Sequence, residues 1–302
     1  MKNVLVIYYS QSGQLESIAR NVAKPLLDSD EMNVLFHEIK LEKPFPFPWK
    51  NEEFFGAFPE SFLQIPSQLK PVSSEILNTK FDLILLNYQV WYLSPSIPIN
   101  SFLKSPEAKI LLNNIPVVTI SGSRNMWIMA HEKIKALLKQ NNAQLKGNIA
   151  LVDRVGNLIS VITIVEWMFS GVKKKYLGLF PLPGVSEKDI QESSKFGNVI
   201  LSSLQENNFG QLQPQLVAID AVRISSYLVT VDRTANKIFQ KWSNFIIKKE
   251  AESRKFWLKF FKVYLLLAIW LISPIVYILH VLTYPFKIKK VKKEIQYFQG
   301  VQ

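Results

Sequence analysis

Short apolar runs alternate with segments of helical periodicity over the first two thirds of the chain. The runs lie at residues 3–9, 34–41, 81–87, 115–120 and 145–152. Each is continuous, as in strands of a parallel sheet that are buried on both faces. The segments between them predict helices at residues 14–28, 98–103, 128–140 and, later, 186–204. This alternation predicts an α/β fold with an open, doubly wound, five-stranded parallel sheet.

One apolar stretch interrupts the pattern before the last predicted helix. Residues 158–169 are apolar nearly all round, and Glu166 is their only charge. They lie in an insertion, residues 154–185, that also contains Lys173-Lys-Lys175. The pattern fits a helix buried against the sheet, and it equally fits a helix that dips into a membrane or covers a substrate.

A second apolar stretch lies near the end of a helical extension, residues 206–302. Residues 263–286 carry no formal charge, and as a helix they extend about 36 Å, against about 30 Å for a bilayer core. An amphipathic, basic helix is predicted before them at residues 235–255. Pro274 lies in the middle and favours a kink or a turn. We expect a membrane segment, either a single span or a re-entrant hairpin hinged at Ser273-Pro274.

Two further segments have no regular pattern. Pro44 to Trp49 contains three prolines among aromatic residues, so it is predicted to form an irregular loop on the domain surface. Residues 61–77 predict a broken helical segment, and residues 216–222 fit either a strand or a short helix.

The residue composition limits the reactions and cofactors that the protein can use. The chain has no Cys and three His, which excludes thiolate chemistry and argues against a metal site, so redox chemistry requires an organic cofactor. The net charge of +12 is concentrated at residues 241–262 and 287–293. These basic clusters flank the apolar run, as in membrane proteins, and no nucleic-acid-binding motif accompanies them. No signal peptide precedes the first strand. We therefore expect a protein of the cytoplasmic membrane with its catalytic domain on the cytoplasmic side.

Three loops follow predicted strands and are expected to meet at one edge of the sheet, where open α/β sheets bind ligands. The first holds Ser10, Gln11, Ser12, Gly13, Gln14 and Leu15. The second holds Gln89, Val90, Trp91, Tyr92 and Leu93. The third holds Ser121, Gly122, Ser123, Arg124, Asn125 and Trp127.

The first loop has the features of a phosphate site. It joins a strand to a helix N-terminus, where unpaired N–H groups and the helix dipole attract an anion. Ser10 and Ser12 add hydroxyl donors, and Gly13 permits positive φ. The aromatic residues Trp91, Tyr92 and Trp127 supply flat walls. Together the loops predict a flavin mononucleotide (FMN) site, although the aromatic residues alone would also fit the covered end of a core.

Residues 1–205 resemble the flavodoxin-like FMN oxidoreductases. The resemblance rests on Ser10-x-Ser12-Gly13, on Val90-Trp91-Tyr92-x-Ser94-Pro95 and on the third loop. Leu15 stands where the family pattern closes with Thr, so one hydroxyl donor is missing. The last helix also comes late, after the insertion.

The whole chain resembles, more narrowly, the dialkylresorcinol condensing enzymes of bacterial aryl-polyene (flexirubin-type) pigment pathways. That resemblance implies a partner ketosynthase and the oxidation, or aromatisation, of a dialkyl-cyclohexane-1,3-dione to a dialkylresorcinol. The expected partners are this apolar ring substrate and the lipid bilayer. The alternatives are a membrane quinone reductase that uses NAD(P)H and a non-catalytic scaffold protein.

Aromatisation removes a hydride and a proton, so it needs a hydride acceptor, a base and a group that stabilises an enolate. Arg124 is the candidate for enolate stabilisation. His131 and Tyr92 are candidate bases, with Glu166 as a further one, although a surface role explains His131 and Glu166 equally well.

Overall fold

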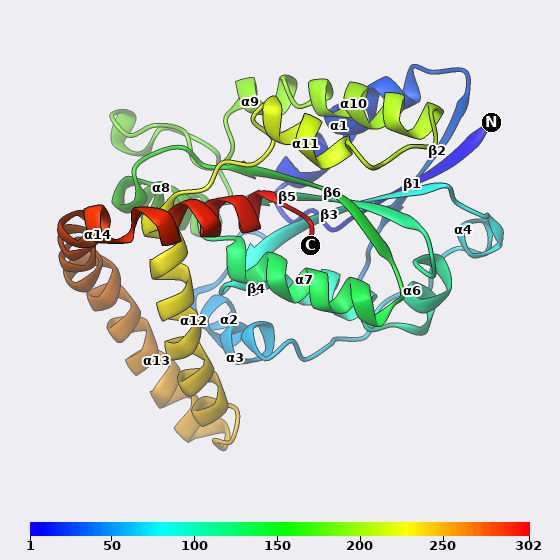
Figure 1. The fold of residues 1–302 in the computed structure, drawn as a ribbon. Helices are drawn as coiled ribbons and strands as arrows, with labels where there is room; N and C mark the ends of the chain where they lie inside the picture. The colour runs from blue at the N-terminus through cyan, green and yellow to red at the C-terminus, as the bar shows by residue number, and fades with distance from the viewer.

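The computed structural model describes residues 1–302, and its centre is a parallel sheet (Figure 1). The strands are β1 (Lys2–Tyr8), β2 (Met32–Glu38), β3 (Leu83–Trp91), β5 (Pro116–Ser123) and β6 (Gln144–Val152). They lie in the order β2-β1-β3-β5-β6 and pair in parallel. This order is that of the flavodoxin-like fold, whose ligand site lies where the order reverses, between β1 and β3. The predicted fold class is confirmed.

Helices cover both faces of the sheet, which is why its strands are continuous apolar runs. Along β3, Leu83 and Leu85 belong to one hydrophobic cluster, whereas Ile84 and Leu86 belong to the other. The first face is covered by α1 (Gln14–Leu27), α9 (Glu187–Gln191), α10 (Ser194–Gln205) and α11 (Leu212–Ala218). The second is covered by α4 (Ser74–Asn78), α5 (Ile97–Leu103), α6 (Pro106–Leu111) and α7 (Ile128–Gln140).

A short hairpin that the pattern did not predict follows β3. Strand β4 (Ser94–Pro95) pairs antiparallel with the end of β3, and Trp91 lies opposite Ser94. The two residues at the turn, Tyr92 and Leu93, have φ of 49° and 58°. This is the geometry of a type I′ turn, which residues with a side chain adopt only under strain.

Several predicted helices differ in their bounds. The last helix of the α/β domain is divided into α9 and α10 at the buried Ser193, whose hydroxyl donates to the Ile190 carbonyl. The segment at residues 61–77 holds only the end of α3 (Phe58–Phe62) and the start of α4, and residues 216–222 begin in α11. The aromatic loop at Pro44–Trp49 is followed by α2 (Asn51–Gly56).

The predicted helix at residues 235–255 is wrong. The structure has two antiparallel helices there, α12 (Ser226–Ile246) and α13 (Ala251–Leu267). The turn between them contains neither Gly nor Pro, so the sequence gives no stop signal. Tertiary packing decides the turn, because folding back brings Phe239 and Phe261 together with Phe58 in one aromatic cluster.

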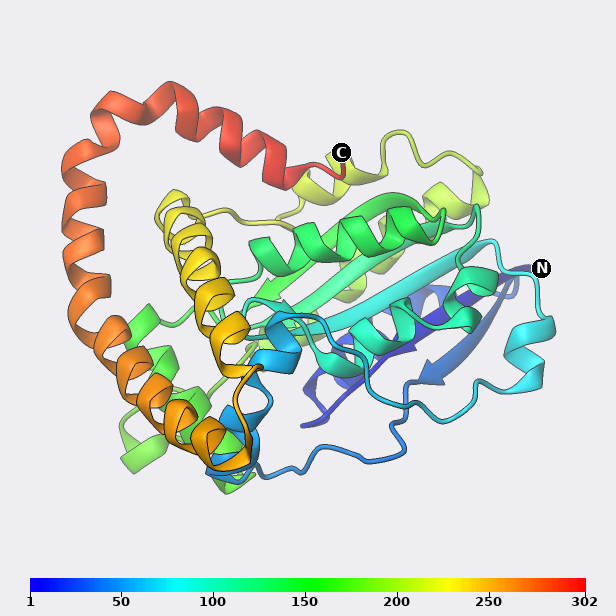
Figure 2. The same ribbon diagram turned by 90° about the horizontal axis from the view of Figure 1, so that it is seen from below.

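The apolar run lies in a continuous, bent helix, so the chain does not turn back at Ser273-Pro274 as it would in the re-entrant hairpin, one of the two expected alternatives. Helix α13 passes through a π-helical turn, Ala268–Ile272, into α14 (Ser273–Gln299). Figure 2 shows the bend as an arc along one side of the molecule. Pro274 has no N–H for the Trp270 carbonyl, which accounts for the irregular turn. We call residues 263–286 the arch.

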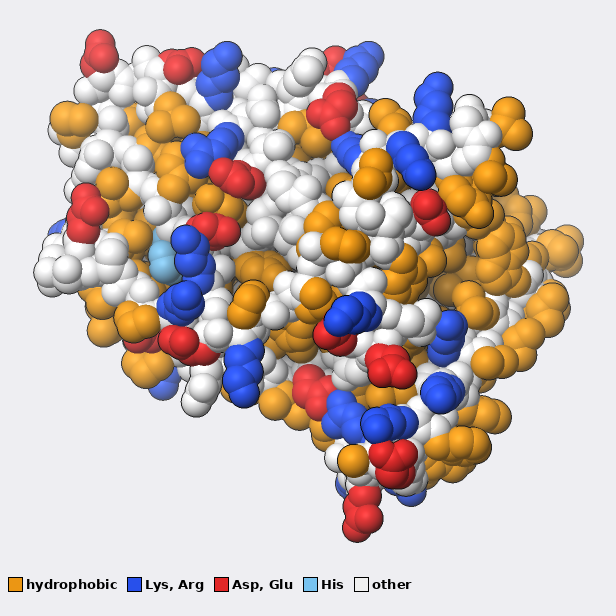
Figure 3. Space-filling model, turned by 180° about the vertical axis from the view of Figure 1, so that it is seen from behind, with side chains coloured by type: hydrophobic (Ala, Val, Ile, Leu, Met, Phe, Trp, Pro, Cys, Tyr) orange, Lys and Arg blue, Asp and Glu red, His pale blue; other side chains and the backbone are white.

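The arch is exposed. The most apolar window of this helix has no residue buried in the protein, and the helix is long and apolar enough to cross a membrane or anchor in one. Phe286, near its end, is 88% exposed. Figure 3 shows hydrophobic side chains gathered along this edge of the molecule.

Candidate functional site

The three predicted loops meet around one cavity of about 250 Å³, which we call the loop cavity. Its walls include predicted residues of all three loops. They are Gln11, Ser12, Gln14, Leu15, Gln89, Val90, Trp91, Tyr92, Gly122, Ser123 and Arg124. The parallel strands β1, β3 and β5 bring these residues together, because they end at the same edge of the sheet.

The first loop is shaped as a strand-to-helix turn with an open helix N-terminus. Gly13 precedes α1 with φ of 81°, and no atom lies within 4 Å of where its Cβ would be. The Glu16 N–H donates to Ser10 Oγ at 3.2 Å, which leaves the Ser10 proton free for another acceptor. This arrangement of N–H groups and hydroxyls suits a phosphate.

Two glutamines of this loop have structural partners. Gln11 donates from Nε2 to the Pro46 carbonyl and accepts from Trp49 Nε1 at 3.1 Å. Gln14 exchanges two hydrogen bonds of 3.1 Å with the backbone of Val185. The loop therefore holds the aromatic loop and the end of the insertion in place. Leu15 is buried against Gly122. A Cβ at Gly122 would lie only 3.1 Å from Leu15 Cδ1, so the missing side chain leaves room for Leu15.

Buried polar atoms in the second and third loops have no partner within the protein. They are Gln89 Nε2, Ser121 Oγ, Ser123 Oγ and Asn125 Oδ1. Buried donors and acceptors are nearly always paired, so unpaired ones at a cavity indicate a ligand that supplies the missing hydrogen bonds. Gln89 and Ser123 line the loop cavity itself. A planar ring with polar edges fits these atoms.

Aromatic side chains close the loop cavity on two sides. Trp91 packs edge-on against Trp49, with ring centroids 5.3 Å apart, and Phe54 packs against Tyr92 and Phe169. The backbone N–H of Trp49 donates to the Met168 carbonyl at 2.8 Å, which joins the aromatic loop to α8 (Asn157–Ser170). Trp49 is therefore buried at the cavity, and the prediction of a surface loop is wrong there.

Sequence reasoning missed these wall residues because they come from outside the three loops. Besides Trp49 and Phe54, helix α8 contributes Ile164, Val165, Trp167, Met168 and Phe169. The apolar insertion therefore covers the loop cavity, one of the alternatives that its sequence allowed. The sequence feature that could have pointed to the wall residues of α8 was the all-round apolar character of the insertion.

Arg124 is the one cation at the loop cavity. Its guanidinium donates from Nη1 to the carbonyl and to Oδ1 of Asn157, at 3.0 and 2.9 Å. Burial lowers the pKa of Arg124 to about 10, and the charge of Asp153 opposes this shift. Both oxygens of Asp153 are already bonded, to the Val155 N–H and the Ser160 hydroxyl. Arg124 is thus charged at neutral pH, half-buried, and not engaged in an ion pair.

The candidate bases are less well placed. The Tyr92 hydroxyl donates to the Phe54 carbonyl at 2.7 Å, and burial raises its pKa well above the usual value. His131 is buried between α7 and β3, where Nδ1 lies 3.2 Å from the Tyr88 hydroxyl, and burial lowers its pKa to about 3. Neither His131 nor Glu166 lines the loop cavity.

The other predicted residues lie around this cavity rather than on its wall. Leu93 lines a neighbouring apolar cavity, while Asn125 and Trp127 line a larger groove. Ser121 is buried in β5, one residue before Gly122.

Comparison with solved structures gives weak matches to flavoproteins. A *Lactobacillus acidophilus* flavoprotein in complex with FMN is 17% identical, covering 50% of this chain and 93% of its own, with a TM-score of 0.40. A flavodoxin from the domain Archaea is 12% identical, with coverages of 68% and 99% and a TM-score of 0.39. A putative flavoprotein from *Bacteroides uniformis* is 17% identical, with coverages of 57% and 99% and a TM-score of 0.38.

No family model matches the chain, and no curated protein matches it in sequence. The assignment to the flavodoxin-like class therefore rests on the strand order and on the position of the loop cavity at the β1/β3 switch point.

Proposed function

We propose that this protein is a membrane-associated, FMN-dependent oxidoreductase that acts on an apolar ring compound. In the most specific form of the proposal, the substrate is a dialkyl-cyclohexane-1,3-dione that a partner ketosynthase supplies, and the product of the oxidation is a dialkylresorcinol. The observation that carries the proposal is Arg124, a half-buried cation in no ion pair, which lines the loop cavity.

The loop cavity supports FMN as the cofactor. The Ser10–Ser12 loop and the N-terminus of α1 would hold its phosphate, and Trp91 and Tyr92 would lie beside its ring. The unpaired Gln89 and Ser123 side chains would bond its polar edge. Bound FMN would supply a two-electron acceptor, which the protein's own side chains lack.

Arg124 would bind the oxygen of the enolate that a 1,3-dione forms when it loses a proton. A half-buried cation stabilises such an anion more strongly than a fully exposed one, because less water screens it. A 1,3-dione is acidic enough to lose this proton to water. A ring carbon of the enolate would then give a hydride to the two-electron acceptor that bound FMN supplies, and a shift of a proton would give the aromatic ring. The two hydrogens lost are thus one proton and one hydride, which balances the oxidation.

The remaining polar groups would position the substrate. The Tyr92 hydroxyl stays protonated because burial raises its pKa, and it donates its proton to the Phe54 carbonyl, so toward a substrate it would accept a hydrogen bond and would not act as a base. The hydrogen bonds to Asn157 fix the guanidinium of Arg124 in the low-water site that α8 and the aromatic loop enclose.

The arch supports attachment to a bilayer from one side. Both ends of its helix are bound to the α/β domain: Arg254 bonds both oxygens of Glu60, and Phe298 is buried in the core beside α11. An exposed apolar helix held at both ends suits insertion into one leaflet. The basic residues at 287–293 would lie at anionic headgroups, with the domain in the cytoplasm.

The test is an absorption spectrum of the detergent-solubilised protein, followed by anaerobic mixing with a dialkyl-cyclohexane-1,3-dione. We expect a bound flavin that bleaches as the dialkylresorcinol forms. In Arg124→Gln the flavin should stay bound while bleaching slows by about 10²-fold, the usual effect of removing one group that stabilises an oxyanion.

Other outcomes would replace the proposal. Reduction of menaquinone by NADH without any change in the dione would identify a membrane quinone reductase. A colourless protein that gains no thermal stability with FMN would instead favour a scaffold without a cofactor.

A further inference from the structure

The arch encloses space between itself and the cofactor loops. A cavity of about 260 Å³, the inner cavity, lies between the turn of the β3–β4 hairpin and the bent helix. It is lined mainly by apolar side chains, from α12 on one side and from the concave face of α13 and the π-helical turn on the other. The convex face of the same helix is exposed.

The inner cavity and the loop cavity share three wall residues, Val90, Tyr92 and Arg124. The two spaces are therefore neighbours. Arg124 is the one charged residue that lines the inner cavity. A molecule in the inner cavity would have apolar walls along its length and a half-buried cation at the end that faces the cofactor loops.

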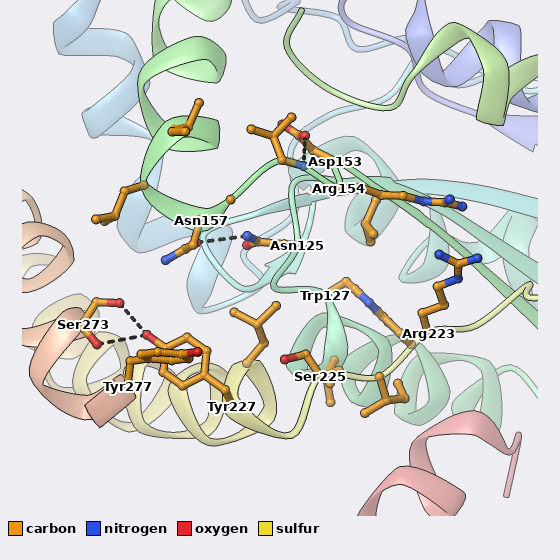
Figure 4. A pocket seen from close by; sticks show the side chains of 18 of the residues that line it. Asn125, Trp127, Asp153, Arg154, Asn157, Arg223, Ser225, Tyr227, Ser273 and Tyr277 are labelled. Atoms are coloured by element: carbon orange, nitrogen blue, oxygen red, sulfur yellow. Dashed lines mark hydrogen bonds between the residues drawn. The ribbon is translucent and has the colours of Figure 1, made fainter. Parts of the chain in front are cut away.

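A larger groove of about 770 Å³ adjoins the inner cavity, with Asn157 and Ser273 lining both. Figure 4 shows this groove, with Asn125 and Asn157 on one side and Tyr227, Ser273 and Tyr277 across from them. We call it the arch groove, because the bent helix forms one of its walls. It meets the inner cavity at Asn157 and Ser273.

The irregular helix geometry coincides with the inner cavity. Ala268 and Ile269, the first two residues of the π-helical turn, line it, and so does Ser273, just after the turn. The Tyr227 hydroxyl donates to the Ser273 carbonyl at 3.0 Å and lies 2.7 Å from Ser273 Oγ. This contact holds the bend open against α12. π-Helical turns are frequent at functional sites, and the small Ala268 leaves room on the concave side.

We propose that the inner cavity binds the ring of an alkyl-substituted phenol, quinone or cyclic dione, which enters from the bilayer along the arch groove. The ring oxygen would face Arg124, and the alkyl chain would lie against the concave side of the arch. This inference rests on the proposed function and names the site of its substrate. The convex face of the bent helix would then lie in lipid, and its concave face would contact the substrate. The same helix would attach the protein to the membrane and admit the substrate.

The experiment uses the full chain in detergent micelles, loaded with FMN. A long-chain alkylresorcinol and unsubstituted resorcinol are the probes, and their binding is followed by the change in the visible flavin band. Ala268→Trp fills the inner cavity from the arch, and Ala235→Phe fills it from α12. Leu271→Trp is the matched control, because Leu271 lies in the same turn but is 60% exposed.

We expect either cavity-filling variant to weaken alkylresorcinol binding at least tenfold without changing FMN affinity, while Leu271→Trp binds like the wild type. Unchanged binding in both cavity-filling variants would overturn the inference. An equal loss in Leu271→Trp would also overturn it, because that result would reflect partition into the micelle.

A failure of the proposed function is distinguishable from a failure of this site. If the protein binds no FMN, thermal unfolding with and without the alkylresorcinol still reports on the inner cavity. Stabilisation of the wild type but not of Ala268→Trp would support the site. No stabilisation of the wild type would overturn it.

Discussion

At the scale of single residues, the structure separates groups that the sequence could only place in the same loops. Arg124 and His131 are seven positions apart; Arg124 is half-buried and His131 is buried. Arg124 points into the space between the cofactor loops and the arch, whereas His131 packs under Trp127 against Tyr88. The chemistry we propose therefore uses Arg124 and leaves His131 a structural role.

Substitution of His131 tests this difference through pH. Its pKa of about 3 in the folded chain lies below the ordinary value of 6.5, so between these values only the unfolded chain binds the proton. Stability is therefore full above pH 6.5 and falls as the pH drops toward 3. In His131→Gln we expect the free energy of unfolding to lose this one-proton slope, about 1.4 kcal/mol per pH unit.

The measurement is denaturant unfolding of both proteins across this pH range. Flavin binding and turnover at neutral pH should stay within a few fold of the wild type. A loss of turnover by two orders of magnitude in a folded His131→Gln protein would make His131 a catalytic base after all.

At the scale of elements, the helices that matter most for function are those outside the regular alternation. Helix α8 covers the loop cavity, and the helix of residues 251–299 bends around a second cavity. Their apolar character was plain in the sequence. Which of their faces meets protein and which is exposed depends on the neighbours, and those are distant in sequence.

The exposed face of the arch gives a test of membrane binding. Leu279→Lys combined with Leu282→Lys places two charges where both side chains are more than half exposed. Because neither side chain is buried, the fold should survive, but charges at lipid depth are unfavourable. We expect the variant to lose most of its sedimentation with vesicles that contain anionic lipids.

Ile110→Lys is the matched control, since Ile110 is 64% exposed on α6. It should sediment like the wild type. Equal binding by the arch variant and the control would refute the arch as the anchor.

At the scale of the whole molecule, both ends of the bent C-terminal helix pack on the α/β domain. The bent helix starts on α3, where Phe261 stacks on Phe58 at 3.9 Å, and it ends on the core. Tyr297 donates to Glu132 of α7, and Gln213 of α11 donates to the Gln299 carbonyl. A straight transmembrane span would have to break one of these two attachments.

Labelling of single cysteines decides the topology, because the chain has no Cys of its own. Lys248→Cys lies in the turn before α13, and Lys293→Cys lies beyond the arch; both positions are exposed. In sealed membrane vesicles a membrane-impermeant maleimide should label both positions from the same side. Labelling from opposite sides would show a span and contradict insertion from one leaflet.

Local pattern and composition determined the α/β fold, the three loops and the apolar character of residues 263–286. Strand periodicity, loop chemistry and hydropathy are properties of neighbouring residues, so one sequence suffices to see them. Leu83 to Leu86 were recognisable as a buried strand, and Ser10 to Gly13 as a strand-to-helix loop that suits a phosphate, without any knowledge of their partners.

Only the tertiary structure decided where the long helices turn and what they enclose. The turn at residues 247–250 has no breaking residue, and it exists because Phe239 and Phe261 bury each other against Phe58. The bend at Ala268–Ile272 is held by Tyr227, a residue about forty positions earlier. Such contacts join distant parts of the chain, so no local pattern contains them, and they create the cavity between Arg124 and the arch.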